Sequence, residues 1–216
     1  MTKKINVKTL MLAAAAAFGL AASASAQGTG STGSTSSAIG TGLLGQSYVG
    51  INYGYTDQHS TPVSNLQGIN LEYNQPLNTG FDLNLGLGDA WSSRFGGTRT
   101  RMQDLNANAI AFLPDLTWGR PFIGVGAGWE WTKTSNVRDN SFVYKLDTGV
   151  EFQVTKELSL TPLVSFTDTT SFHTDNKWAY GVKANYWITS QWAVSAAVMR
   201  DNMVNTTYSV GANFRF

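Results

Sequence analysis

Apolar and polar residues alternate along most of the chain from residue 46 onward. The last ten residues show the pattern most clearly, because small or polar residues separate a series of apolar ones there: Tyr208, Val210, Ala212, Phe214 and Phe216. A period of two places successive side chains on opposite faces of a β-strand, whereas an amphipathic helix repeats every 3.6 residues. The pattern therefore predicts strands almost throughout, and helical spacing is hard to find.

Ten segments show this alternation, an even number, as is typical of single-chain bacterial barrels. The fourth is the weakest, because Ile110 and Phe112 interrupt its polar face. Pro162 lies within the seventh and has no backbone N–H, so we expect a local bulge there. The segments cover residues 49–55, 68–74, 81–88, 101–113, 123–131, 142–154, 158–167, 178–188, 192–198 and 207–216.

The connections between segments alternate in length. Polar and mostly longer ones lie near 58–65, 90–100, 133–141, 168–176 and 200–204, and generally tighter ones lie near 76–79, 114–120, 155–157 and 189–190. The 114–120 turn is the exception, since it is about as long as several loops. Short turns on the periplasmic side and longer loops outside are typical of outer-membrane barrels, and the C-terminus then lies on the periplasmic side.

The apolar face is predicted to meet lipid and the polar face to line a lumen. The tryptophans support this, because they lie near predicted strand ends and so form two girdles at the lipid headgroups. Trp91, Trp129, Trp131 and Trp178 lie towards the loops, and Trp118, Trp187 and Trp192 towards the turns. The alternative is a soluble β-sandwich or lipocalin-like barrel. Its outer face should be richer in lysine and glutamate than a chain with 13% charged residues allows.

The N-terminus predicts export. Residues 1–26 have the features of a secretory signal peptide: three lysines within the first eight residues, an apolar stretch at 10–22 and an A-x-A site ending at Ala26. Residues 27–45 are rich in glycine, serine and threonine and are predicted to be a flexible linker, which leaves 46–216 as one barrel domain.

The charge balance and the cysteine content exclude several classes of function. Three of the 15 basic residues lie in the predicted signal peptide, so 12 remain against 14 acidic ones, which argues against a nucleic-acid partner. The chain has no cysteine, so thiol catalysis and most structural zinc sites are excluded. We expect no cofactor and no metal.

Residues 46–216 resemble the small outer-membrane β-barrels of Gram-negative bacteria, broadly the OmpA/OmpX/Opa-like group. The glycine-rich run Pro121–Gly128 and the ending Asn213–Phe216 carry the resemblance. It implies an all-β fold, a transmembrane antiparallel up-and-down barrel. Our count is ten strands; most of those relatives have eight, which is the alternative. It also implies that the barrel assembly machinery recognises the C-terminal strand through Tyr208, Val210, Phe214 and Phe216.

The polar faces carry charges of both signs. These are predicted to form ion pairs that fill a narrow interior, because buried charges must be paired. The predicted lumen network consists of Glu72, Asp82, Asp104, Glu130, Lys145, Asp147, Glu151, Lys183 and Arg215. The alternative is an acid-rich path for water or ions.

Two further features bear on function. His59 and His173 both lie in predicted loops, and no motif of the known barrel enzymes is present in full, so we expect no catalytic residues and no enzyme. Arg94, Arg99 and Arg101 share the second long loop with Trp91 and are candidates for contact with lipopolysaccharide phosphates.

The sequence thus predicts an integral barrel of the outer membrane with a structural or surface-interaction role. A narrow porin-like channel is the first alternative, and a lipid hydrolase or acyltransferase is the second. Outer-membrane lipid or lipopolysaccharide and the assembly machinery are the expected partners, and the oligomeric state stays open.

Overall fold

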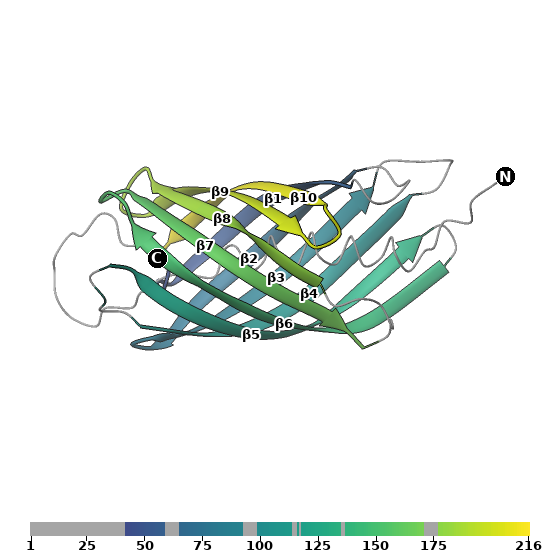
Figure 1. The fold of residues 1–216 in the computed structure, drawn as a ribbon, viewed down its shortest axis with the longest axis horizontal. Helices are drawn as coiled ribbons and strands as arrows, with labels where there is room; N and C mark the ends of the chain where they lie inside the picture. The colour runs from purple at the N-terminus through teal and green to yellow at the C-terminus, as the bar shows by residue number, and fades with distance from the viewer. Residues whose placement is uncertain are drawn as a thin grey trace.

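The described part of the chain in the computed structural model comprises residues 42–58, 65–92, 99–113, 116, 118–134, 137–170 and 177–216. These residues form ten antiparallel strands that close into a barrel (Figure 1), so the prediction of ten strands is confirmed. The strands are β1 (Tyr48–Asp57), β2 (Leu66–Asn78), β3 (Phe81–Ser92), β4 (Thr100–Phe112), β5 (Arg120–Thr134), β6 (Val137–Gln153), β7 (Leu158–Thr169), β8 (Lys177–Trp187), β9 (Trp192–Asp201) and β10 (Thr206–Arg215).

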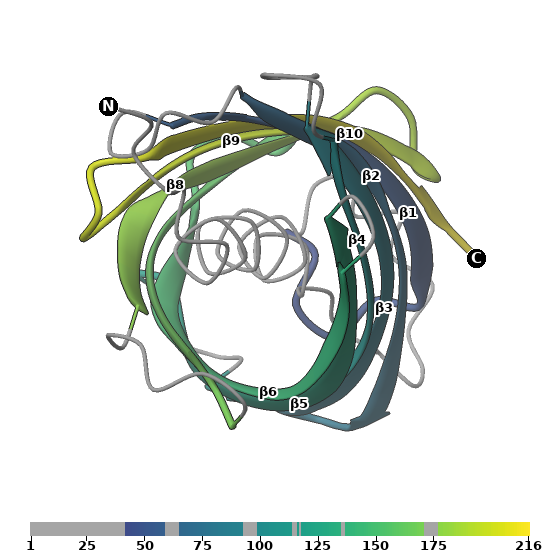
Figure 2. The ribbon, with the colours of Figure 1, turned by 90° about the vertical axis from the view of Figure 1, so that its right-hand side faces the viewer.

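Each strand pairs with its neighbours in sequence, and β1 pairs with β10 to close the barrel. Tyr48 lies opposite Arg215 and Asp57 opposite Thr206, so all ten residues of β1 are paired on that side. Figure 2 shows the closed ring in a view along the barrel. Closure leaves no strand edge with unpaired backbone groups, which is what a sheet needs in order to lie in lipid. No helix in the described ranges is long and apolar enough to cross a membrane.

The two faces of the wall differ as the alternation predicts. In β9 exposed and buried residues alternate without interruption, with Val194 and Val198 outward and Ser195 inward. Most inward positions elsewhere in the wall carry polar side chains, and many large apolar side chains are exposed on the outside. The interior is therefore polar and the exterior apolar, the reverse of a soluble protein.

Six tryptophans lie on the outside of the wall or its turns, but Trp187 does not. Its side chain is 1% exposed and packs inside against Leu43, Tyr48 and Ala193. Its assignment to the outer girdle is therefore wrong. Trp187 lies at the end of β8, as a girdle residue would, but its position in the alternation of β8 places its side chain on the inward face.

The expected bulge at Pro162 is also wrong. Gly149 pairs with Leu163 and Phe152 with Leu160, so β6 and β7 keep one register past the proline. The ladder is interrupted for two residue pairs, at Pro162, which has no N–H to donate, and at the adjacent Thr161. The register shifts instead between Pro76 and Asn78 in the β2–β3 hairpin.

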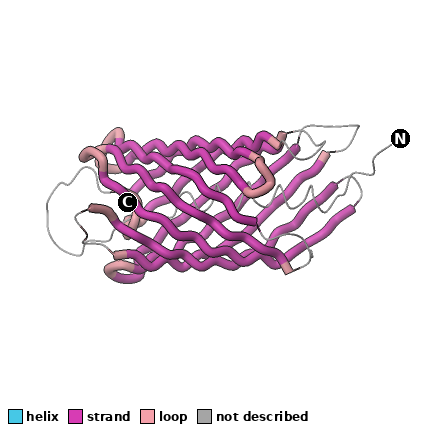
Figure 3. The backbone as a smooth tube through the Cα atoms, viewed as in Figure 1, coloured by secondary structure: helices cyan, strands magenta, loops and turns pink. Residues whose placement is uncertain are grey.

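The wall is not of even height. Strands β4, β5 and β6 contain 13, 15 and 17 residues, whereas β8, β9, β10 and β1 contain 10 or 11. Figure 3 shows the long strands crossing the whole barrel. The end that carries the tight turns is called here the turn side, and the opposite end the loop side.

Candidate functional site

Residues Gly42–Ser47, which precede β1, lie inside the barrel at its turn side and are called here the strap. Gly42, Leu43, Leu44 and Gly45 are buried, and Figure 2 shows the segment, in purple, within the ring of strands. Residues 42–45 therefore do not belong to a flexible linker, which corrects the boundary drawn from composition. The rest of that linker and the predicted signal peptide lie outside the described residues.

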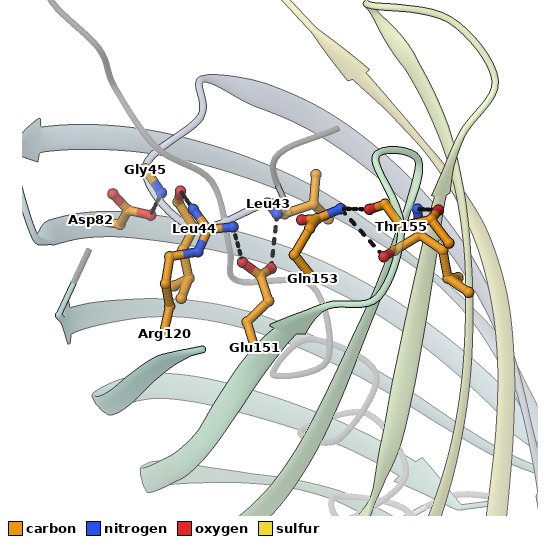
Figure 4. A network of polar contacts seen from close by, with 9 residues as sticks. Leu43, Leu44, Gly45, Asp82, Arg120, Glu151, Gln153 and Thr155 are labelled. Atoms are coloured by element: carbon orange, nitrogen blue, oxygen red, sulfur yellow. Dashed lines mark hydrogen bonds and ion pairs between the residues drawn. The ribbon is translucent and has the colours of Figure 1, made fainter. Parts of the chain in front are cut away.

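Acidic residues from the wall bind the backbone of the strap (Figure 4). The N–H of Leu43 donates to Glu151 Oε2 at 2.9 Å, and the N–H of Gly45 donates to Asp82 Oδ2 at 2.7 Å. Arg120 forms an ion pair with Glu151 and also donates to the carbonyl of Leu44 at 3.4 Å. Charge-assisted bonds of this kind are stronger than neutral ones, so Asp82, Arg120 and Glu151 act as a latch.

A buried asparagine extends the latch to the last part of the strap. The side-chain amide of Asn74 donates to the carbonyl of Gln46 at 3.0 Å and to Asp82 Oδ2 at 3.1 Å. Asp82 therefore accepts bonds from both the strap and the wall, and its side chain has no solvent exposure. Because β2, β3, β5 and β6 each contribute a group, the strap is held on one half of the circumference.

Two leucines of the strap bury apolar surface in an otherwise polar interior. Leu44 joins a cluster with inward side chains of several strands: Ile110, Phe112, Phe122, Leu163, Ala179 and Met199. Leu43 joins Tyr48, Trp187 and Ala193. Full burial of a leucine contributes about 1.5–3 kcal/mol, so the stabilisation of the strap by the two leucines is comparable to that by its hydrogen bonds.

This cluster explains the irregularity of the fourth segment. Ile110 and Phe112 interrupt the polar face of β4 because they belong to the same buried apolar cluster as Leu44. Apolar residues at inward positions of β4 and β5 were thus the sequence signal for an internal partner, although they did not reveal which segment it was.

Glycine is required at both ends of the latched segment. A Cβ on Gly42 would lie 2.0 Å from the carboxyl carbon of Glu151, so a larger residue would displace the latch. Gly45 has φ 67°, in the left-handed region that glycine adopts at no steric cost.

The middle of the interior contains carboxylates held by amide groups. Glu72 Oε1 accepts from Asn70 at 2.8 Å and from Asn52 at 3.1 Å, and Ser195 donates to Asn52 at 3.2 Å. These contacts join β2, β1 and β9 on the inside of the barrel. Lys183, buried on β8, lies near enough to interact electrostatically with Glu72.

A second group of charges lies on the long strands. Lys145 Nζ lies 3.2 Å from Asp147 Oδ2, and Ser165 donates to Asp147 Oδ1 at 2.6 Å. Asp104 accepts from Asn106 at 2.7 Å. Lys145, Asp147 and Asp104 are therefore each bound to another side chain of the wall.

Hydroxyl groups line the loop-side part of the interior. Thr132 donates to Glu130 at 3.0 Å, and the hydroxyls of Thr100 and Thr134 are also 3.0 Å apart. Lys177 is buried at the same end, at the start of β8. The interior is therefore layered from hydroxyls at the loop side, through amides and charges, to the strap.

The predicted lumen residues fall into two groups. Arg215 lies at the turn-side rim, where it donates to the carbonyl of Ser190 and stacks 4.5 Å above the ring of Trp187. The others occupy inward positions: Glu72, Asp82, Asp104, Glu130, Lys145, Asp147, Glu151 and Lys183. Arg120 and Lys177 are not among the predicted lumen residues, because both precede the predicted segments 123–131 and 178–188. Acidic groups outnumber basic ones on the inward face of the described strands.

The C-terminal residues quoted for the assembly signal lie on the outer face of β10 and just beyond it. Tyr208 and Val210 are exposed, Phe214 packs on Trp192 with ring centroids 4.9 Å apart, and Phe216 stacks on Tyr73 at 6.2 Å. The contact with Trp192 thus joins β10 to its neighbour β9, whereas Phe216 reaches across β1 to Tyr73 of β2.

Catalytic and metal chemistry gain no support from the described residues. His59, His173 and Arg94 lie outside them, so the two histidines cannot be placed relative to one another. No group of three or more histidine, aspartate and glutamate side chains suited to a metal ion occurs among the described ranges.

Comparison with solved structures identifies the class of fold. The translocator domain of the autotransporter NalP from Neisseria meningitidis aligns with 96% of this chain and 98% of its own length, with a TM-score of 0.54 and 11% identity. The chain has the fold of an outer-membrane β-barrel. The NanC porin covers 78% of this chain and all of its own, with a TM-score of 0.47 and 10% identity. Neisserial surface protein A covers 78% of this chain and 96% of its own, with a TM-score of 0.46 and 11% identity. No protein-family description and no curated protein sequence matches the chain.

Proposed function

We propose that this chain is an integral outer-membrane barrel whose turn side is closed by its own strap, and that its role is structural or surface-interacting rather than that of an open pore. The single observation that carries the proposal is the strap itself. It lies in the bore, with both leucines fully buried and its backbone bonded to Asp82, Arg120 and Glu151. A solute entering from the turn side would have to displace it.

The proposed orientation places the tight turns in the periplasm and the longer connections outside the cell. Export through the predicted signal peptide and recognition of the C-terminal strand by the assembly machinery belong to the same proposal. The aromatic contacts of Phe214 with β9 and of Phe216 with β2 support it, because they hold the C-terminal end on both sides of the closing seam.

Planar-bilayer recording of the mature chain tests the proposal. We expect no stable single-channel current from correctly folded protein, because the strap and its apolar cluster occupy the turn side. Folding is checked on the same sample by its shifted electrophoretic mobility without heating. Reproducible open channels in most insertions would refute a closed barrel.

A narrow, gated path for small cations is the second candidate. The observation that favours it is the excess of acidic over basic groups on the inward face. If the strap left its seat, the hydroxyl and amide layers would line an aqueous path. Such a path should prefer cations, and a preference for anions would exclude it.

A further inference from the structure

Basic residues from three separate strands lie side by side on the outside of the tall wall. Arg101 of β4 lies directly opposite Lys133 of β5, and Lys133 lies directly opposite Arg138 of β6. All three side chains are exposed and point outward. Trp91 of β3 continues the row next to Arg101. These three charges are called here the cationic row.

Such an arrangement is unfavourable on its own. Directly opposed residues in an antiparallel pair have Cβ atoms about 4.5–5.5 Å apart, and like charges at that spacing destabilise the sheet. Asp89 offsets part of the charge through two bonds from Arg101, at 2.8 and 2.5 Å. Among the described residues, Lys133 and Arg138 have no ion pair with an acid. An anion from outside the chain would offset the remaining charge.

The row lies at the height of lipid headgroups. With a rise of about 3.3 Å per residue and a tilt of about 40°, the ten steps from Pro121 to Trp131 climb about 25 Å, which matches the apolar band of outer-membrane barrels. Outward residues of β5 within that span are apolar, and Trp129 and Trp131 end it. Lys133 is the next outward residue beyond them.

The row just below it suggests a sugar next to the phosphate. Trp131 lies directly between Gln103 of β4 and Asn140 of β6. Amide groups pair with hydroxyls, and an indole ring presents a flat apolar face, so this level fits a sugar ring. The level below contains Leu105, Trp129 and Phe142, which suit acyl chains.

We propose that the outer surface of β4, β5 and β6 binds a phosphorylated glycolipid of the outer leaflet, with its phosphate on the cationic row. The inference rests on the proposed orientation, in which the loop side faces outward. The sequence makes Arg94, Arg99 and Arg101 of the second long loop candidates for contact with lipopolysaccharide phosphates. Of these three, only Arg101 belongs to the cationic row, and Arg94 lies outside the described residues. The proposed phosphate contact is therefore on the wall and not on the loop.

Glycolipid binding to the folded barrel tests the proposal. Barrel in phosphatidylcholine nanodiscs is titrated with lipid A, with dephosphorylated lipid A and with phosphatidylglycerol in separate arms. We expect lipid A to bind more tightly than the other two by about tenfold or more, since juxtamembrane basic residues each contribute about a factor of five towards anionic lipid. Equal affinity in all three arms would overturn the proposal.

Two variants make the assignment specific. Lys133→Ala with Arg138→Ala should lower lipid A affinity about tenfold or more, whereas Arg200→Ala should leave it within twofold. Arg200 is the matched control because it is exposed on the outward face near the loop side but lies opposite Tyr180 and Thr206 rather than other cations. Equal losses in both variants would show a general charge effect and overturn the site.

The like-charge contacts provide a second, independent readout. Lys133→Glu turns both cross-strand contacts into attractive ones, so in phosphatidylcholine alone it should raise the urea midpoint of unfolding while it abolishes the preference for lipid A. A destabilised but folded variant, or one that keeps its preference, would contradict the role given to the row. If the barrel failed to insert into phosphatidylcholine nanodiscs, this would be seen before lipid A is added, and it would count against the proposed function rather than against the lipid site.

Discussion

Replacing both strap leucines, Leu43→Ser with Leu44→Ser, is expected to turn a silent barrel into a conducting one. Both side chains are fully buried, Leu43 in the cluster that contains Trp187 and Leu44 in the cluster that contains Phe112. Truncating a buried leucine costs about 2–5 kcal/mol, so the double change removes about as much stabilisation as the charge-assisted bonds of the strap supply at about 1.5–3 kcal/mol each. The strap should leave its seat.

The barrel itself should survive that change. Its ten strands are held by a closed ladder that begins at Tyr48, and the strap adds to it only the carbonyl of Ser47, which accepts from the N–H of Phe216 at 3.3 Å. The measurement is single-channel current in planar bilayers. The matched control is Leu77→Ser with Leu113→Ser, which makes the same chemical change at two exposed leucines on the turn side. A strap variant that remains as silent as its control would show that the leucines do not hold the closure.

Arg120→Ala is expected to destabilise the folded barrel by about 3 kcal/mol, because it leaves a buried carboxylate without its cation. Glu151 has a fully buried side chain, and Arg120 is its ion-pair partner. Removing one partner of such a pair costs more than the pair itself contributes, since the remaining charge stays desolvated. The free energy of unfolding, measured by urea titration in lipid vesicles, gives the effect.

Two further variants separate burial from charge. Arg101→Ala breaks an ion pair with Asp89 that is exposed to solvent, and it should cost less than about 1 kcal/mol. Adding Glu151→Gln to Arg120→Ala should recover part of the loss, because an amide is cheaper to bury than a carboxylate. Equal losses for Arg120→Ala and Arg101→Ala would mean that the turn side is hydrated rather than closed.

Most of the wall could be predicted from the sequence, because the signal for each strand lies within the strand's own residues. Alternation with a period of two determines which residues are strands and which face each presents, as in β9 and β10. The number of strands follows from counting segments, and all ten are found in the structure.

The strap could not be predicted, because six residues in a glycine-rich stretch carry no period. Its seat depends on residues far away in sequence, since Leu43 and Glu151 are 108 positions apart. Only the apolar residues Ile110 and Phe112 on a polar face hinted at it. The cationic row was hidden for another reason: its three members become neighbours only through the registers of β4, β5 and β6.

The central claim, that the strap fills the turn side of the bore, is tested most directly by the reactivity of one introduced thiol. The chain has no cysteine, so Leu44→Cys can be labelled with a bulky, charged maleimide without background. Lys156→Cys, in the exposed turn at the same end, is the reference for full access. The thiol at position 44 should stay unlabelled in the folded barrel and react once the protein is unfolded. Labelling at the rate of the reference in the folded state would contradict the account.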